Sequence, residues 1–285
     1  MVEPVRFEDP RTVLKRHGLS PKHSWGQNFL VSGRAIAIIV RACVDQPERR
    51  ILEIGAGLGT LTGPILEQGG RVTAVERDRE MCAVLRDEFG GSDAFELVEA
   101  DAVTFDYPSF LSKQQSVIVG NLPYQLTGRI LRRLLASSPG FLRAVLMVQE
   151  EVANRIVARE NDKGRGALSV NAQARCQSKI IHRLGPAAFH PQPKVRSAVV
   201  VFEPLEHPFF SQGKEEADFE AVVKAAFSCR RKTMRNALSI GGLGSNDRVT
   251  KLLQDAGIDP GIRPSSLSVE NFTRLAKLHA NRTKD

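Results

Sequence analysis

The sequence predicts an α/β protein with a doubly wound, mostly parallel sheet that ends in an antiparallel hairpin, followed by a small all-helical domain. Three observations lead to this fold class. Short apolar runs alternate with helical patterns between residues 51 and 159, which is typical of parallel strands joined by right-handed crossovers. Two later apolar runs have no long helix between them. After residue 204 only helical patterns follow.

Two helices are expected before the alternating region. Asp9 is a candidate N-cap for a short helix that starts at Pro10 and ends at His17. Ser32 is a candidate cap for a second helix over residues 33–44, in which apolar side chains recur at helical spacing.

The remaining elements follow from the same patterns. Buried strands are expected over residues 51–54, 71–75, 95–98, 116–119 and 142–148. Helices are expected over residues 60–68, 78–89, 126–136 and 149–159. The hairpin is expected over residues 180–184 and 197–202, and the tail helices over residues 219–227, 233–238, 249–256 and 269–279. We therefore predict a sheet domain over residues 1–204 and a helical domain over residues 205–285.

Composition restricts the class of protein. The chain has 285 residues, 42% hydrophobic and 25% charged, which excludes a disordered or fibrous chain. It has neither an apolar run of membrane-spanning length nor a signal peptide at its start, so we expect a soluble cytoplasmic protein. Its four cysteines are far apart and its histidines show no ligand spacing, so no metal is expected. The single Trp25 is interpreted as structural or solvated.

The formal charge of +8 is unevenly distributed along the chain. Residues 51–128 hold five basic and twelve acidic side chains, so the rest of the chain carries the positive charge. An acidic segment within a basic protein fits a small cationic ligand and a body that binds nucleic acid. The alternative interpretation is a solvated surface whose charges are uneven by chance.

Three glycines directly follow the first predicted strand, at Gly55, Gly57 and Gly59. Glycine at these positions allows a sharp turn and a close approach of a ligand to the backbone. The GxGxG spacing differs from the GxGxxG of dinucleotide-binding loops, which makes NAD a weaker candidate. Taken alone, an ordinary strand-to-helix turn explains the glycines about as well.

Acidic residues at the ends of the next two strands favour a cofactor site. Glu76 stands 21 residues after Gly55, where a carboxylate can accept hydrogen bonds from both ribose hydroxyls of a nucleoside. Asp101 follows the third strand, where it can accept from an adenine amino group. These residues suit an adenosine cofactor that lacks a diphosphate, and the cationic S-adenosylmethionine fits the negative local charge.

The fourth predicted strand runs into Asn121-Leu122-Pro123-Tyr124. Alone, this could be an ordinary turn with one buried tyrosine. At the end of a strand of a cofactor sheet, it resembles the signature of methyltransferases that modify exocyclic amino groups of bases. An adenine N6 lone pair is delocalised, so its hydrogens must be held by acceptors, and the Asn121 side-chain carbonyl and the Leu122 backbone carbonyl are candidates. Tyr124 would stack on the base.

Similar segments extend over most of the chain, from about residue 22 to residue 279. On these segments the chain resembles the ribosomal RNA adenine N6,N6-dimethyltransferase family, and most closely its bacterial small-subunit branch. The segments are residues 26–30, 53–62, 75–78, 99–102, 120–124, 149–156, 189–200 and 230–236.

The resemblance implies a fold, a cofactor and a set of site residues. The fold would be a Rossmann-like S-adenosylmethionine-dependent methyltransferase sheet with a helical C-terminal domain. Phe189 would sandwich the target base from the side opposite Tyr124, so that the catalytic residues would be Asn121, Leu122, Tyr124 and Phe189. The implied cofactor contacts are Asn28, Leu30, Gly55, Glu76, Asp101 and Asn121.

The resemblance also implies a substrate and partners. Two adjacent adenines near the 3′ end of 16S rRNA would be dimethylated, in the small ribosomal subunit or its precursor, by a monomer without a metal or a membrane. Basic residues of the tail are candidate RNA contacts, namely Arg230, Arg231, Lys232 and Arg235. Two departures from the family pattern, Arg165 and Arg196, add positive charge near the expected RNA face.

Two other functions remain as alternatives. One is the antibiotic-resistance relative that acts on large-subunit rRNA, which usually has Ile where this chain has Leu122 and lacks the basic segment at residues 230–236. The other is a non-catalytic ribosome assembly factor that keeps the fold. The intact Glu76 and Asn121-Leu122-Pro123-Tyr124 motif favour an active enzyme.

Overall fold

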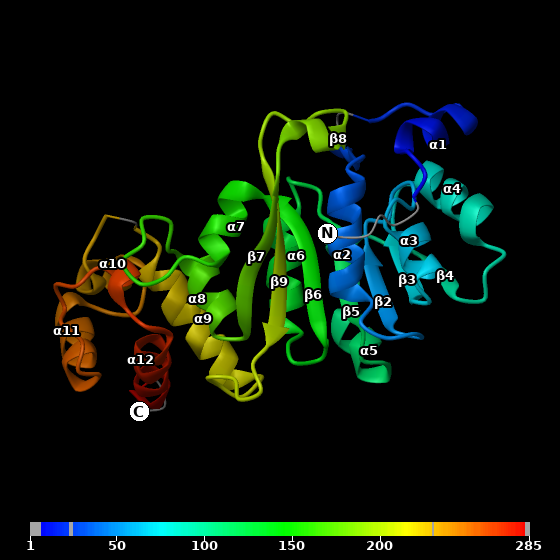
Figure 1. The fold of residues 1–285 in the computed structure, drawn as a ribbon. Helices are drawn as coiled ribbons and strands as arrows, with labels where there is room; N and C mark the ends of the chain where they lie inside the picture. The colour runs from blue at the N-terminus through cyan, green and yellow to red at the C-terminus, as the bar shows by residue number, and fades with distance from the viewer. Residues whose placement is uncertain (1–6, 23–24, 230, 283–285) are drawn as a thin grey trace. The chain divides into compact units, whose positions relative to one another are not determined.

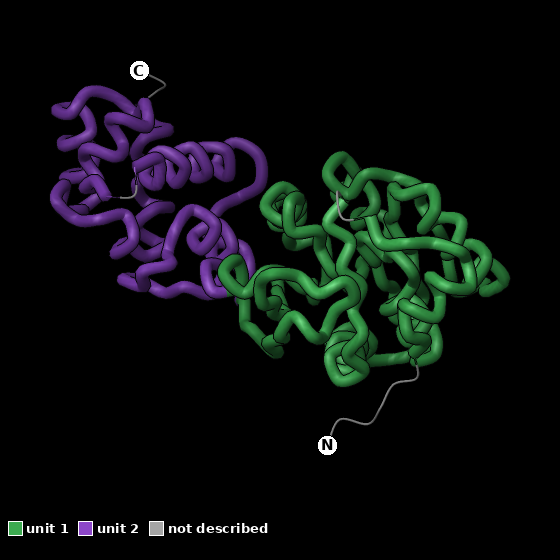
Figure 2. Tube along the Cα trace, turned by 90° about the horizontal axis from the view of Figure 1, so that it is seen from above, with its two compact units in different colours: residues 1–153, 178–204 green, residues 154–177, 205–285 purple. Residues whose placement is uncertain are grey.

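The structure is a computed structural model that describes residues 7–22, 25–229 and 231–282. The chain divides into two compact units, which Figure 2 distinguishes by colour. Unit 1 comprises residues 1–153 and 178–204, and unit 2 comprises residues 154–177 and 205–285. The predicted boundary after residue 204 coincides with the passage from unit 1 to unit 2. The grouping of residues 154–177 with the helical tail differs from the prediction of two consecutive domains.

Unit 1 is built on a seven-stranded sheet with the order β4-β3-β2-β5-β6-β9-β7 (Figure 1). Strands β4, β3, β2, β5 and β6 pair in parallel, whereas β9 pairs antiparallel to β6. This confirms the predicted α/β class and its mostly parallel sheet. The strands are β2 (Arg50–Ile54), β3 (Arg71–Glu76), β4 (Phe95–Glu99), β5 (Val117–Asn121), β6 (Arg143–Gln149), β7 (Cys176–Leu184) and β9 (Ser197–Pro204).

Helices alternate with these strands, and a short second sheet pairs β1 (Phe29–Leu30) with β8 (Phe189–His190). Both predicted N-caps are present, since Asp9 accepts from the backbone N–H of Arg11 and Ser32 accepts from that of Ala35. The helices up to α7 are α1 (Pro10–Arg16), α2 (Gly33–Cys43), α3 (Thr62–Glu67), α4 (Arg79–Phe89), α5 (Tyr107–Lys113), α6 (Thr127–Ala136) and α7 (Glu150–Ile156).

The α5 helix was not predicted, although Asp106 caps it and a proline lies in its first turn. Its seven residues are too few for a clear apolar period. The remaining helices were predicted with two exceptions: α8 was missed, and α9 begins five residues before the predicted start. These helices are α8 (Ala167–Gln173), α9 (Lys214–Ala226), α10 (Met234–Ile240), α11 (Asn246–Asp255) and α12 (Val269–Arg282). No described helix is long and apolar enough to span a membrane.

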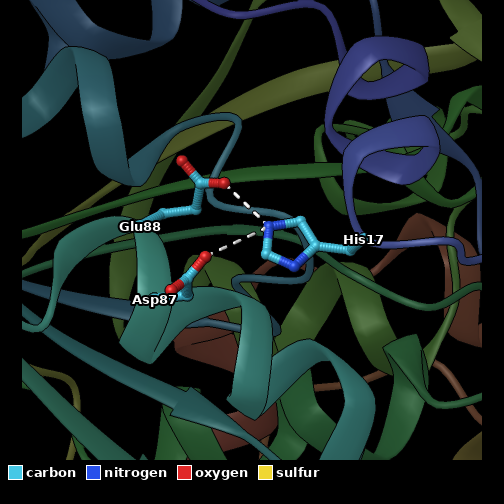
Figure 3. A group of neighbouring side chains, drawn as sticks. All are labelled: His17, Asp87 and Glu88. Carbon is cyan, nitrogen blue, oxygen red and sulfur yellow. Dashed lines mark hydrogen bonds and ion pairs between the residues drawn. The ribbon is translucent and has the colours of Figure 1, made fainter.

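A small cluster of polar side chains joins α1 to α4 (Figure 3). His17 Nε2 lies 2.8 Å from Glu88 Oε1 and 3.8 Å from Asp87 Oδ2. Arg16 binds the same Glu88 oxygen at 2.6 Å. The His17 ring and the Arg16 guanidinium hold the pKa of Glu88 below its usual value, although its partial burial opposes this. We assign this cluster a structural role, because the Arg16 guanidinium already pairs with the Glu88 carboxylate.

Unit 2 has its own apolar core, and Arg165 is part of its framework. The side chain of Arg165 is only 5% exposed. Its guanidinium donates to the backbone carbonyls of Ala158 and Leu267 and to the side chain of Gln173. Burial lowers the pKa of Arg165. The expectation that Arg165 adds charge to an RNA-facing surface is therefore wrong, because the side chain is buried and its two terminal nitrogens donate inside unit 2.

Candidate active site

A cavity of about 270 Å³ opens in unit 1 at the carboxyl ends of β2, β3 and β5. Its lining comes from segments far apart in the sequence, which the parallel strands bring to one edge of the sheet. All six predicted cofactor contacts line it, together with Leu122 and Tyr124. These six are Asn28, Leu30, Gly55, Glu76, Asp101 and Asn121.

The glycine loop after β2 has the backbone that its sequence predicts. Gly55, Gly57 and Gly59 all have positive φ angles, of 68°, 57° and 76°. A β-carbon at Gly59 would also overlap the ring of Phe89. The three glycines are therefore required by backbone conformation, and the last one also by packing.

Backbone donors hold the Glu76 carboxylate at the end of β3. Gly57 N donates to Oε2 at 3.0 Å, and the backbone N–H groups of Arg77 and Asp78 donate to Oε1 at 2.8 and 2.9 Å. Each carboxylate oxygen can accept further hydrogen bonds. The carboxylate is therefore fixed in place at the cavity, with acceptor capacity left for a ligand.

Asp78 ties the N-terminal segment to the same strand end, which the sequence analysis did not foresee. Its buried carboxylate accepts from Lys22 Nζ at 2.8 and 2.9 Å and from Gln27 Nε2 at 2.9 Å. It also caps α4 by accepting from Glu80 N. The capping role is readable from sequence. The clamp on Lys22 and Gln27 is not, because both residues are more than 50 positions away from Asp78 in the sequence.

Trp25 is exposed, as its interpretation as structural or solvated allows, and it also lines the cavity. Its ring is 42% exposed, and the guanidinium carbon of Arg77 lies 4.7 Å from the ring centroid. Arg77 also pairs with Asp101 Oδ2 at 2.8 Å, while Val103 N donates to Asp101 Oδ1. Trp25, Arg77 and Asp101 thus form a connected wall, and a tryptophan in an irregular segment gives no sequence signal for such a place.

Glu53 is a buried carboxyl group beside the glycine loop. Thr62 Oγ1 donates to its Oε2 at 2.6 Å. Burial raises the pKa of Glu53 to about 8, and the nearby Glu76 charge adds to this effect. Glu53 lines the cavity as well, so its protonation changes the charge next to the cofactor loop.

The Asn121 side chain has a defined orientation. Its Nδ2 donates to the backbone carbonyl of Asn28 at 2.9 Å. Because the amide nitrogen is used in this way, the side-chain carbonyl of Asn121 is left to accept from a ligand. The adjoining Leu122 carbonyl accepts no hydrogen bond within the described part of the chain.

Tyr124 and Phe189 occupy different environments. Tyr124 lines the cavity, its hydroxyl lies 2.7 Å from Ser197 Oγ, and burial raises its pKa. Phe189 does not line the cavity. Its ring is 2% exposed and packs in the apolar cluster that contains Leu30. A base-stacking role for Phe189 stays a prediction that requires its ring to leave this cluster.

Three of the four basic residues predicted to contact RNA are exposed cations of unit 2. Arg231, Lys232 and Arg235 are exposed and form no ion pair with any residue that the structure describes. Arg230 lies outside the described residues. In unit 1, the side chain of Arg196 is 59% exposed and pairs with Glu150, which also pairs with Arg183, so the three residues keep a net positive charge.

The comparison with known proteins is decisive for the family. A family model described as "Ribosomal RNA adenine dimethylase" matches residues 18–281. The chain belongs to this family. Being a ribosomal RNA adenine dimethylase, it is a methyltransferase whose cofactor is S-adenosylmethionine, as predicted.

Individual relatives agree with the family match. Proteins named "Ribosomal RNA small subunit methyltransferase A" are similar over almost their whole length. That of Anaeromyxobacter dehalogenans (strain 2CP-C) is 39% identical over 282 residues, 95% of this chain and 97% of the relative. That of Syntrophotalea carbinolica is 41% identical over 260 residues, 90% of this chain and 96% of the relative.

Two solved structures share the fold. A dimethyladenosine transferase from Plasmodium falciparum has a TM-score of 0.73 at 22% identity, covering 87% of this chain and 95% of its own. The 23S rRNA methyltransferase ErmE has a TM-score of 0.66 at 27% identity, covering 89% of this chain and 100% of its own.

The cavity fits the cofactor that the dimethylase family uses. The Glu76 carboxylate can accept from the two ribose hydroxyls, and Asp101 can accept from the adenine amino group. The acidic residues around the cavity also suit a sulfonium. The Gly57 N–H donates to Glu76 and is therefore not free to bind a phosphate. This agrees with a cofactor that has no diphosphate.

We predict that Glu76→Ala weakens binding of S-adenosylmethionine tenfold or more, since hydrogen bonds to a charged group contribute roughly 1.5 to 3 kcal/mol. Titration calorimetry measures this affinity. Glu99→Ala is the matched control. Glu99 lies on β4 directly opposite Glu76 of β3 and does not line the cavity. Wild-type affinity in Glu76→Ala would refute the assignment.

We predict that Glu53 makes stability depend on pH. Its pKa in the folded chain, about 8, exceeds its ordinary value of 4.5, so the folded state retains a proton that the unfolded state releases. The free energy of unfolding therefore has a contribution that is lost as pH rises from about 4.5 to about 8. Urea unfolding without cofactor at about pH 5 and about pH 8 measures this contribution. Between these two pH values the free energy of unfolding should fall less in Glu53→Gln than in wild type. The exposed Glu67→Gln is the control, and equal losses in Glu53→Gln and wild type would contradict the prediction.

Proposed function

We propose that this chain dimethylates the N6 amino groups of two adjacent adenines near the 3′ end of 16S rRNA in the small ribosomal subunit. The orientation of Asn121 carries the proposal, because its amide carbonyl is left as an acceptor at the cofactor cavity. The names of relatives about 40% identical to this chain support the small subunit as the substrate. We also propose that the chain acts in the cytoplasm. That the chain is a monomer stays a prediction.

The chemistry that we propose depends on positioning. S-adenosylmethionine supplies an electrophilic methyl group on a sulfonium. The Asn121 side-chain carbonyl and the Leu122 backbone carbonyl accept the two N6 hydrogens, which localises the nitrogen lone pair for attack. The ring of Tyr124 stacks on the adenine and holds it in line. A strong general base is not required, because methylation makes the product amine acidic.

Methyl transfer to defined substrates tests the proposal. Small-subunit particles from a strain that lacks this modification, naked 16S rRNA, and 23S rRNA are compared as substrates, and modified positions are mapped by primer extension. We expect two adjacent dimethyladenines near the 3′ end of 16S rRNA. Modification of 23S rRNA would favour the activity that the name of ErmE describes, and particle binding without methylation would favour an assembly factor.

We predict a graded series of variants at the reacting loop. Tyr124→Phe should keep most activity because the ring survives, whereas Tyr124→Ala should lose roughly 1 to 3 kcal/mol of stacking. Asn121→Ala should lose more and should not recover at high pH, because the missing group is an acceptor and not a base. Partially active variants should accumulate monomethyladenine. The monomethylated amine has only one N6 hydrogen left for the acceptors to hold, so the second transfer is the more sensitive to a weakened site. Mass spectrometry of digested RNA measures both products, and a fully active Tyr124→Ala would overturn the stacking role.

We predict that the exposed basic residues of unit 2 bind rRNA. Reversing charge at Arg231 and Lys232 should weaken RNA binding and flatten its salt dependence, because fewer phosphates are neutralised. Cofactor affinity should not change. For a single reversal, Lys232→Glu is compared with Lys251→Glu, an exposed lysine on α11. Equal salt slopes for these two variants and wild type would indicate that Lys232 only faces solvent.

A further inference from the structure

The Tyr124 side chain is held at both ends. Its backbone belongs to the loop after β5, in which the Pro123 carbonyl accepts from Leu126 N at 2.9 Å and from Thr127 Oγ1 at 3.0 Å. Its phenol oxygen lies 2.7 Å from Ser197 Oγ, within hydrogen-bond distance. These two attachments come from parts of the sequence 73 residues apart.

Ser197 is a rigid anchor point. It is fully buried and is the first residue of β9, where it lies opposite Gln149 in the antiparallel register with β6. The preceding residue is held as well, because Glu150 N donates to the carbonyl of Arg196 at 2.9 Å. The position of the Ser197 hydroxyl is therefore set by the sheet and not by the loop.

We propose that Ser197 is a positioning residue for methyl transfer, whose hydroxyl holds the far end of the Tyr124 ring and so fixes where the ring lies against the target adenine. The inference rests on the proposed function, since it concerns the stacking platform of that reaction. The loop fixes only the backbone of Tyr124, and its ring can still rotate about two side-chain bonds. A hydrogen bond at the far end of the ring restrains the rotation that swings the whole ring, because that rotation moves the phenol oxygen away from Ser197. The phenol oxygen lies on the axis of the other rotation, which the hydrogen bond restrains only through the preference of the hydroxyl for the plane of the ring.

This anchor has a further consequence for the phenol group. The hydroxyl of Tyr124 is engaged with Ser197, so it serves orientation and not proton transfer. The second methylation needs the tighter geometry, because a monomethylated amine offers a single hydrogen for the two acceptors. Loss of the anchor should therefore reduce the second transfer more than the first.

A double-mutant cycle tests the proposal. Ser197→Ala and Tyr124→Phe each remove the same hydrogen bond, so each should keep most of the rate of the first methyl transfer and lower the rate of the second about fivefold, and the double variant should be no slower than either single variant. Both should raise the ratio of monomethyladenine to dimethyladenine, with the affinity for S-adenosylmethionine unchanged. Ser197→Thr, which keeps the hydroxyl, should restore the rate of the second transfer and the product ratio. Multiplicative losses in the double variant, or wild-type kinetics in Ser197→Ala, would overturn the proposal.

A spectroscopic measurement separates this inference from the proposed function. The chain holds two tyrosines, so ring-labelled tyrosine gives few NMR signals, and those lost in Tyr124→Phe belong to Tyr124. In Ser197→Ala these signals should shift and report a mobile ring, while the Tyr107 signals stay in place. Unchanged Tyr124 signals would overturn the anchor even if rRNA is methylated. A wild-type chain that does not methylate rRNA, with a ring that Ser197 still fixes, would overturn the proposed function alone.

Discussion

The active site depends on a carboxylate that the backbone holds. Glu76 accepts from the N–H groups of Gly57, Arg77 and Asp78, so the glycine loop after β2 and the turn after β3 share one acceptor. The hydrogen bond from Gly57 requires a left-handed backbone, which glycine adopts without strain. If Glu76 binds the cofactor as predicted, the conformation of the glycine loop and cofactor binding depend on the same carboxylate.

The N-terminal segment completes the site through two tethers. Asp78 holds Lys22 and Gln27, and Asn121 donates to the carbonyl of Asn28. The second tether connects cofactor binding with the reacting loop, because it also orients the Asn121 amide. In the proposed function, the residue that accepts the substrate hydrogens is thus aligned by the segment that lines the cofactor cavity.

Several features of the site lay beyond the sequence analysis for physical reasons. Trp25 reaches the cavity because Arg77 lies against its ring, and neither residue has a spacing that indicates this contact. Arg165 was expected at a charged surface, yet it is buried, because carbonyls of Ala158 and Leu267 meet its donors in unit 2. Phe189 matches a family motif, but its ring packs in the core. A motif match identifies which residue stands at a position. Whether that residue is buried depends on the neighbours that the fold places around it.

The sequence by itself determined most of the strands and helices along the chain, the glycine turn, and the acidic residues at the ends of β3 and β4. These are local properties, set by apolar periodicity and by backbone conformations that only certain residues adopt. Only the tertiary structure decided that residues 154–177 group with the helical tail, that Asp78 binds Lys22 and Gln27, and that Ser197 meets Tyr124. Such contacts join segments tens of residues apart, and their geometry exists only once the sheet has fixed which strand ends lie together.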